Sequence, residues 1–309
     1  MRKVAFIIGL LFSAAGIGFG QSSPTVNVND IIDIELLTHT EIYDKIHKQG
    51  KTSVIIVNGG TEQRGPHDVL GGHTLVGHAM AIEIAKKLGN ALVAPTLPFS
   101  PTGVSEAMPG AVSIPNDVFM AVNTAEIESM ATNGFKDIFV MGDHGGGQEQ
   151  LKQVAEQEDQ KLSPKGIRVY YISDYYEKSD TDFELYSIDH HIPITGHAGV
   201  SDTSELLYFE PSAGKYVRSI YKTVPFDPGP TPEEWKAQMA RRNNPQPAER
   251  AQRGGAQRGE RAANPNRVNN GVSSDPHLAS KELGKVMVDI TVNNTIAEIH
   301  KQMAEKRGK

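Results

Sequence analysis

The sequence predicts an α/β fold, a layered, mainly parallel sheet with helices on both faces. Short apolar runs alternate with helix-length segments over residues 52–173, as in strands joined by helical crossovers. Two of the runs, residues 52–57 and 137–141, are dense in β-branched and apolar side chains, which is typical of strands buried on both faces. Each run is followed directly by a polar, glycine-rich loop. The 309 residues suit one α/β domain with appendages.

Helical spacing and glycine stops place the other elements in order. Ile42 and Ile46 are four residues apart in a helix that Gly50 ends, just before the first strand. A basic last turn and Gly89 end the helix that follows this strand. The expected elements after the first strand are a helix at 73–88, a strand at 91–94, a helix between Pro115 and Gly134, a strand at 137–141, a helix at 148–160, a strand at 168–173 and a final helix at 279–296.

The two glycine-rich loops at strand ends are the first candidates for a functional site. In open α/β sheets, ligands bind at the carboxyl ends of the strands. The first loop carries Glu62, Arg64, His67, Asp68 and His73. The second reads GDHGGG at residues 142–147 and lacks the Lys-Ser/Thr pair that a phosphate-binding loop would place next. Both loops are expected to face each other over one sheet edge.

Two further segments allow two interpretations each. The Pro-rich segment 95–109 is either a binding loop over the site or a plain crossover. Residues 241–270 hold seven Arg, two Glu and few apolar side chains, so we expect a disordered insertion there. The insertion is either a solvated loop or a basic arm for an acidic partner.

The N-terminus predicts export. A charged start, a short apolar middle and small residues near position 20 are typical of a secretory signal peptide, which we assign to residues 1–21. An uncleaved anchor is the alternative, although the apolar part is short for a membrane span. Residues 22–309 then form a single domain without stable membrane insertion, and we expect the protein to be periplasmic or secreted. The formal charge of −6 argues against nucleic acid and favours a small-molecule substrate.

Histidine and acidic residues in these loops predict a metal site. The chain has no Cys, so a metal must be held by nitrogen and oxygen donors. Glu62, His73, His144 and Asp202 form a donor set that suits Zn²⁺ and, less well, Mn²⁺ or Fe²⁺. The neighbouring Asp143 either orients an imidazole or replaces His144 as a ligand.

Five motifs stand in a fixed order: TEQRGPH at 61–67, LGGHT at 70–74, PGAVSI at 109–114, GDHGG at 142–146 and GHAGVSDTS at 196–204. Together they resemble the creatininase (creatinine amidohydrolase) family, with its TEQHGPH, LGTDT, PGT-S-S, NGHGGN and GHAGEAETS segments. The resemblance implies a layered α/β hydrolase, commonly a homo-oligomer. A metal pair in such a hydrolase activates a water that cleaves a C–N bond of a cyclic amide or related substrate.

Carried over by position, the resemblance makes Glu62 and His144 metal ligands and puts Asp202 where the family has a ligand Glu. His197 matches a histidine that gives a proton to the leaving nitrogen. His67 matches the last histidine of the first motif, and we place it with the catalytic residues. Two positions depart from the pattern: Arg64 stands for a ligand His, and His73 for an Asp that bridges two metals.

These departures predict that one metal ion binds, and zinc is the preferred metal. Arg64 has no lone pair and would repel a second dication, so we expect Glu62, His73 and His144 to hold a single ion. Asp202 would be its fourth or outer ligand, and Arg64 would steady the oxyanion or a substrate carboxylate. The alternatives are a binding protein that kept the fold and lost catalysis, and an adaptor that works through the basic segment.

Overall fold

The computed structural model describes residues 27–243 and 268–307, and a four-stranded parallel sheet lies at its centre. The strands stand in the order β2-β1-β3-β4, and each neighbouring pair is parallel. The predicted α/β class with a parallel sheet is confirmed. The strands are β1 (Ser53–Asn58), β2 (Ala91–Val93), β3 (Asp137–Gly142) and β4 (Arg168–Tyr171).

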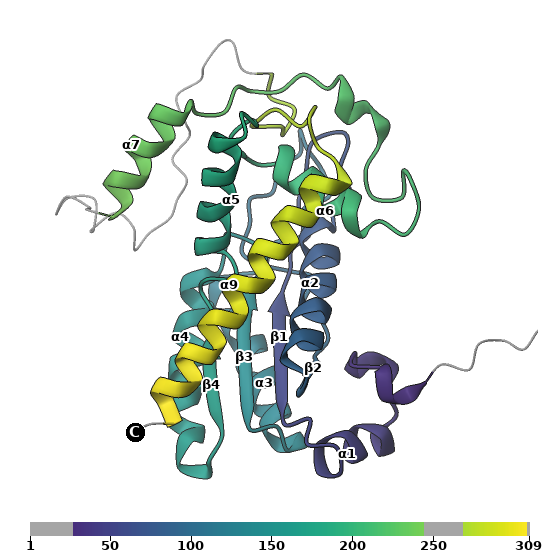
Figure 1. Ribbon diagram of the computed structural model, residues 1–309, viewed down its shortest axis with the longest axis vertical. Coiled ribbons are helices and arrows are strands. Elements are labelled where there is room, and N and C mark those ends of the chain that lie inside the picture. Colours follow the sequence, from purple (N-terminus) through teal and green to yellow (C-terminus); the bar gives the residue numbers. More distant parts are fainter. Residues whose placement is uncertain (1–26, 244–267, 308–309) are drawn as a thin grey trace, which may run out of the picture.

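Helices join the strands and cover the sheet (Figure 1). The α-helices are α1 (His39–His47), α2 (Gly72–Leu88), α3 (Asn116–Asn133), α4 (Gln148–Leu162), α5 (Glu177–Asp189), α6 (Val200–Phe209), α7 (Pro232–Asn243) and α9 (Lys281–Arg307). Short 3₁₀ helices span Val28–Asp30, Ile34–Leu36, Ser163–Lys165 and Ser219–Lys222.

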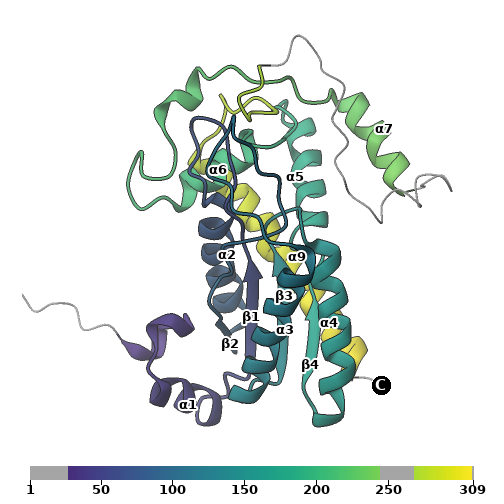
Figure 2. The ribbon, with the colours of Figure 1, turned by 180° about the vertical axis from the view of Figure 1, so that it is seen from behind.

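Alternate residues of β1 point to two separate apolar cores, because successive side chains of a strand face opposite sides of the sheet. Ile55 and Val57 pack with α2, α6 and α9, and α9 runs diagonally across this face in Figure 1. Val54 and Ile56 pack with α3 and α4, which lie on the other face (Figure 2). All four side chains are fully buried, and each stabilises the fold by about 1.5–3 kcal/mol. The predicted helical layers on both faces are confirmed.

The register of the two central strands positions the predicted site. Asn58, the last residue of β1, pairs with Gly142, the last residue of β3. The N–H of Asp143 then donates to the Asn58 carbonyl over 2.8 Å. The loops that follow β1 and β3 therefore leave the sheet side by side at its carboxyl edge, as the sequence predicted.

Some segments differ from the expectation. Helices α5, α6 and α7 were not predicted, since their apolar residues do not mark a single clear face. Helix α7 extends to Asn243, so residues 241–243 of the predicted insertion are helical. At its other end, Val268 N–H donates to Asp227 and Asn270 donates to the Pro225 carbonyl. Residues 244–267 lie outside the described part of the chain.

The signal prediction for residues 1–21 also falls on residues that the structure does not describe. Among the helices that it does describe, none combines the length and the apolar character needed to cross a bilayer.

A buried amide pair ties the end of β1 to α3 and yields a stability prediction. Asn58 Nδ2 donates to Asn123 Oδ1 over 2.9 Å, and Asn123 Nδ2 donates back over 3.0 Å. Asn123→Ala leaves the Asn58 amide without this partner, so the free energy of unfolding should fall by about 1–3 kcal/mol. The double variant Asn58→Ala/Asn123→Ala should cost clearly less than the two single changes added together, because both partners are then gone. Urea denaturation measures all four proteins, and strictly additive costs would contradict the pair.

Candidate metal centre

Three elements deliver three metal-type side chains to the carboxyl edge of the sheet. Glu62 lies four residues after β1, His144 lies two residues after β3, and His73 stands in the first turn of α2. Because β1 and β3 end in register, Glu62 and His144 start from neighbouring points. Helix α2 packs on β1, which brings His73 next to Glu62 and His144.

Glu62 lies between the two imidazoles. Its Oε1 is 3.2 Å from His73 Nε2, and its Oε2 is 3.2 Å from His144 Nε2. One donor atom from each residue falls within 4.8 Å of the others, so a single ion could contact all three. The side chains are only 10–14% exposed. The predicted trio of Glu62, His73 and His144 is brought together.

Each imidazole is oriented from behind. His73 Nδ1 donates to Asp143 Oδ2 over 2.9 Å, and the Tyr175 hydroxyl donates to Asp143 Oδ1 over 2.6 Å. A proton on His73 Nδ1 leaves the Nε2 lone pair for a metal, the arrangement seen in carboxylate–histidine–metal triads. His144 Nδ1 lies 3.0 Å from Ser100 Oγ. In this geometry Asp143 holds the His73 ring, and His144 Nε2 is the atom that faces Glu62.

Asp202 has a different partner from the predicted ion. Its Oδ2 lies 3.0 Å from Arg64 Nη2 and accepts a hydrogen bond from Ala198 N–H over 2.9 Å. Among the described residues, the group that can share an ion contains Glu62, His73 and His144, without Asp202. The prediction of Asp202 as fourth ligand therefore does not fit this geometry, because the Arg64 guanidinium takes the carboxylate.

Within the ion pair between Arg64 and Asp202, the guanidinium is enclosed, whereas the carboxylate is 21% exposed. The Arg64 side chain is 2% exposed, and its Nε and Nη1 have no hydrogen-bond partner in the described part of the chain. Burial raises the pKa of Asp202, but Arg64, the neighbouring imidazoles and the hydrogen bond from Ala198 N–H together hold that pKa below its usual range. Both groups are therefore charged at neutral pH, and each depends on the other.

The charges around Glu62 favour its ionised form. Burial raises the pKa of Glu62, but hydrogen bonds from His144 and His73 outweigh burial and hold the pKa well below its usual range. Burial lowers the pKa of His73, and the carboxylates of Asp143 and Glu62 more than offset this effect. An ionised carboxylate beside two imidazoles is a suitable donor set for a borderline cation such as Zn²⁺.

The sequence profile of the family described as "Creatininase: Creatinine amidohydrolase" matches residues 35–299. The chain belongs to the creatininase family. No curated protein matched the sequence.

Solved creatininase structures share the fold. A creatinine amidohydrolase (creatininase) aligns with a TM-score of 0.65 at 19% identity, over 88% of this chain and 98% of that one. A manganese form of creatininase gives a TM-score of 0.65 at 18% identity, with the same shares covered. A Zn–Zn form of a creatininase variant gives 0.62 at 18% identity, again over 88% and 98%. The predicted creatininase-like architecture is confirmed.

His197 approaches the cluster of this creatininase-family chain from the loop before α6. Its Nδ1 is 3.4 Å from Glu62 Oε1, and its Nε2 bonds the Gln63 carbonyl. Burial lowers the pKa of His197 despite the nearby carboxylates, so the ring is neutral at pH 7. With 28% of its side chain exposed, His197 is the most accessible imidazole around Glu62.

His67 lies beneath the site and not in it. The ring is fully buried, and its Nε2 is 3.1 Å from both the Ala198 carbonyl and Thr203 Oγ1. Burial lowers its pKa to about 4. A side chain with no exposed surface cannot touch a substrate, so the structure gives His67 a positioning role: it joins the first motif to the loop that carries His197.

The Pro-rich segment 95–109 supplies two contacts that the sequence did not indicate. Thr102 Oγ1 donates to Glu62 Oε2 over 2.8 Å, and Ser100 contacts His144. The interpretation as a loop over the site therefore fits better than a plain crossover.

Close packing also explains the glycines after His144: a Cβ on Gly146 would lie 2.0 Å from the Pro101 carbonyl oxygen. Tyr175, just after β4, was missed because only the parallel sheet brings the end of β4 beside that of β3.

Asp68, next to His67, gives the fold a specific pH dependence. Burial raises its pKa to about 7 against the opposing charge of Arg64. In the unfolded chain, an Asp titrates near pH 4. The folded chain therefore binds more protons between these values, and its stability falls as pH rises from about 4 to about 7.

Asp68→Asn lacks this titration. Relative to the unchanged protein, the variant should gain about 3 kcal/mol of stability between pH 4.5 and pH 8. The oppositely directed titration of His67 is present in both proteins and cancels in the difference. Denaturant unfolding at several pH values measures the two free energies. An equal difference between the proteins at both ends of the range would show that Asp68 is ionised in the fold throughout.

Proposed function

We propose that the protein is a metal-dependent amidohydrolase that cleaves a C–N bond in a cyclic amide or a related small substrate. The observation that carries the proposal is the cluster of Glu62, His73 and His144, whose donor atoms converge within 4.8 Å in a chain of the creatininase family. The donor set fits a divalent metal ion. It combines one carboxylate with two imidazoles, and no lysine or arginine pairs with Glu62 in the described residues.

Glu62, His73 and His144 would hold one divalent cation, with Zn²⁺ first and Mn²⁺ or Fe²⁺ as alternatives. When bound, such a cation supplies Lewis acidity towards a carbonyl and lowers the pKa of a water molecule towards 7. Three protein ligands leave a position open, as in catalytic zinc sites. The creatininase structures described as a manganese form and a Zn–Zn form support this choice of cations.

Residues of this chain would carry out the proton transfer to the leaving nitrogen of the substrate. Neutral His197 lies beside Glu62, so it can take a proton at Nδ1 and pass it to the leaving nitrogen of the substrate. Thr102 Oγ1 donates to Glu62 Oε2 and holds the carboxylate in place. Segment 95–109, which carries Thr102, would form one wall of the substrate site and limit the access of water.

Arg64 would supply the positive charge that a second metal ion would otherwise bring to this site. It lies in the first motif, where the resemblance places a family ligand, and its positive charge is matched by Asp202. A guanidinium cannot coordinate a cation and would repel one. Since Nε and Nη1 are enclosed, we assign Arg64 to charge balance behind the ligands in place of direct contact with an oxyanion.

The same replacement favours the second candidate function, a small-molecule or metal-binding protein that kept the fold and lost hydrolysis. Turnover separates the two. With zinc added, the purified protein should hydrolyse at least one member of a panel of cyclic amides, lactones and small peptides. We expect creatinine itself to be a poor substrate, because the ligand set differs from the family pattern.

Glu62→Gln should reduce this turnover by at least about a hundredfold, since a neutral amide binds the cation weakly. Glu233→Gln makes the same change at an exposed residue of α7, so it is the matched control and should keep full activity. Initial rates with and without a chelator measure the effect. Zinc binding without turnover of any panel member would favour the binding protein.

Restoring the family's pattern tests the one-ion proposal. Arg64→His removes the fixed cation, and His73→Asp supplies a carboxylate that can bridge two metals. The double variant should bind two zinc ions per chain, whereas the unchanged protein binds one. Elemental analysis after gel filtration gives both stoichiometries. Arg64→Lys, which keeps the charge, should stay at one ion; two ions in the unchanged protein would refute the proposal.

A further inference from the structure

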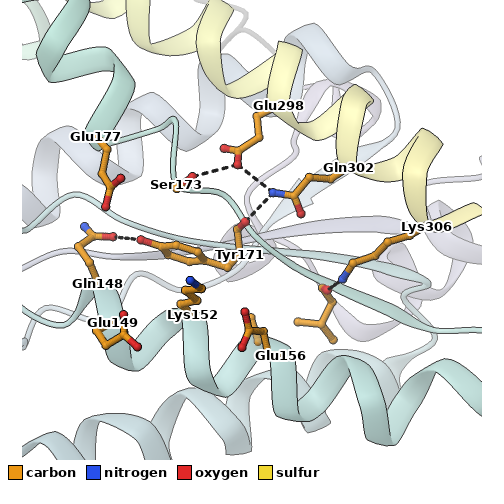
Figure 3. A pocket seen from close by; sticks show the side chains of 12 residues that line it. Gln148, Glu149, Lys152, Glu156, Tyr171, Ser173, Glu177, Glu298, Gln302 and Lys306 are labelled. Atoms are coloured by element: carbon orange, nitrogen blue, oxygen red, sulfur yellow. Dashed lines mark hydrogen bonds between the residues drawn. The ribbon is translucent and has the colours of Figure 1, made fainter. Parts of the chain in front are cut away.

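Residues 171–176, at and after the end of β4, carry four hydroxyl groups, and the fold uses two of them as shown in Figure 3. The Tyr171 hydroxyl donates to Gln148 Oε1 over 2.7 Å. Ser173 Oγ donates to Glu298 Oε1 over 3.1 Å. Both hydroxyl groups are therefore committed to contacts within the fold.

The other two hydroxyl groups belong to Tyr175 and Tyr176. Tyr175 is buried, and its hydroxyl donates to Asp143 over 2.6 Å. The Tyr176 hydroxyl makes no hydrogen bond to another residue in the described part of the chain, and its oxygen is not enclosed. It is therefore the hydroxyl of this segment that a bound substrate could reach.

The Tyr176 hydroxyl lies against the loop that carries His144. A Cβ added to Gly145, the next residue, would come within 2.8 Å of the hydroxyl oxygen. Glycine at position 145 thus leaves space for the end of the Tyr176 side chain, directly beside one of the three side chains of the metal centre.

Carboxylates of the same region act on this hydroxyl. The charge of Asp180, together with burial, raises the pKa of Tyr176 well above its usual range, and three carboxylates at the metal centre add to the effect: Asp202, Asp143 and Glu62. The hydroxyl therefore keeps its proton at neutral pH and is available as a hydrogen-bond donor.

We propose that Tyr176 is a catalytic residue whose hydroxyl donates a hydrogen bond to the carbonyl oxygen of the substrate amide, an inference that rests on the proposed hydrolase function. When water adds to the carbonyl carbon, the π electron pair moves onto this oxygen. The Tyr176 hydroxyl stabilises the resulting oxyanion and keeps its own proton. The C–N bond then breaks, and the leaving nitrogen takes its proton from His197. Arg64 cannot supply the donor, because its free N–H groups are enclosed.

Tyr176→Phe tests this role, because it removes the hydroxyl and keeps the ring. With zinc bound, kcat for the hydrolysed panel member should fall about a hundredfold, the loss typical of one oxyanion donor, while KM changes by less than about threefold. Tyr43→Phe makes the same change at an exposed residue of α1, at the amino end of the sheet, and should keep full activity (Figure 1). An unchanged kcat in Tyr176→Phe, whatever happens to KM, would overturn the proposal.

Two binding measurements are independent of turnover. Zinc should bind to Tyr176→Phe as tightly as to the unchanged protein, whereas Tyr175→Phe, which releases Asp143, should bind zinc at least about tenfold more weakly. Acetohydroxamate, a small anion with an amide-like carbonyl, should bind to zinc-loaded Tyr176→Phe at least about tenfold more weakly than to the zinc-loaded unchanged protein. Isothermal titration measures both affinities.

The titration with acetohydroxamate also separates this proposal from the proposed function. If the unchanged protein hydrolysed no member of the panel, the hydrolase would be contradicted, and the hydroxamate affinities would still test the contact with Tyr176. Equal affinities in the two proteins, or binding to neither, would overturn the role of Tyr176.

Gly145→Ala tests the position of the hydroxyl. The added methyl group would push the Tyr176 oxygen aside, so kcat should fall. In Tyr176→Phe the same change should add little further loss, because the hydroxyl is already absent. Zinc stoichiometry, measured on each variant, separates this loss from damage to His144, and thermal unfolding confirms that each variant is folded. Losses that multiply in the double variant would show that the hydroxyl acts elsewhere.

Discussion

The pairing of Asn58 with Gly142 at the ends of β1 and β3 is the constraint on which the site depends. It makes two loops from distant parts of the sequence leave the sheet at neighbouring points. Glu62 and His144 can then face each other across 3.2 Å without any long-range adjustment. The reciprocal amide pair with Asn123 holds this end of β1 against α3. A slip of one residue in the register would send alternate side chains to the wrong core and separate the ligands.

Behind the ligands, the buried charges form two groups with different tasks. Asp143, held by Tyr175, orients His73 and belongs to the metal centre. The Arg64 guanidinium, paired with Asp202, is more buried than the three side chains of the metal cluster and carries a fixed positive charge. Breaking a buried pair leaves one uncompensated charge, which costs about 3–5 kcal/mol, so neither member is free to change alone. Under the proposal of one bound ion, this coupling would let a single altered ligand position change the number of ions that the fold accepts.

Much of the fold could be predicted from the sequence, because the central strands are short, apolar and closed by glycine. The trio of Glu62, His73 and His144 could also be predicted, since all three residues stand at strand ends or a helix start. The role of Asp202 could not be predicted: a carboxylate reads the same whether it faces a cation or a guanidinium. The contacts of Thr102 and Tyr175 were missed for a related reason, because they depend on how loop 95–109 folds back and on β4 lying beside β3. The helices α5 and α6 were not predicted because each buries only one or two large apolar side chains among small and polar ones.

The central claim is that three side chains from β1, β3 and α2 share a single cation while Arg64 fills the place of another. Anomalous diffraction at the zinc absorption edge, on crystals of the zinc-loaded protein, tests this claim most directly. The account predicts one peak per chain, about 2.0–2.2 Å from Glu62 oxygen and from the His73 and His144 nitrogens, with the Arg64 guanidinium still against Asp202. Two peaks, or one peak bound by Asp202 and not by His73, would contradict it.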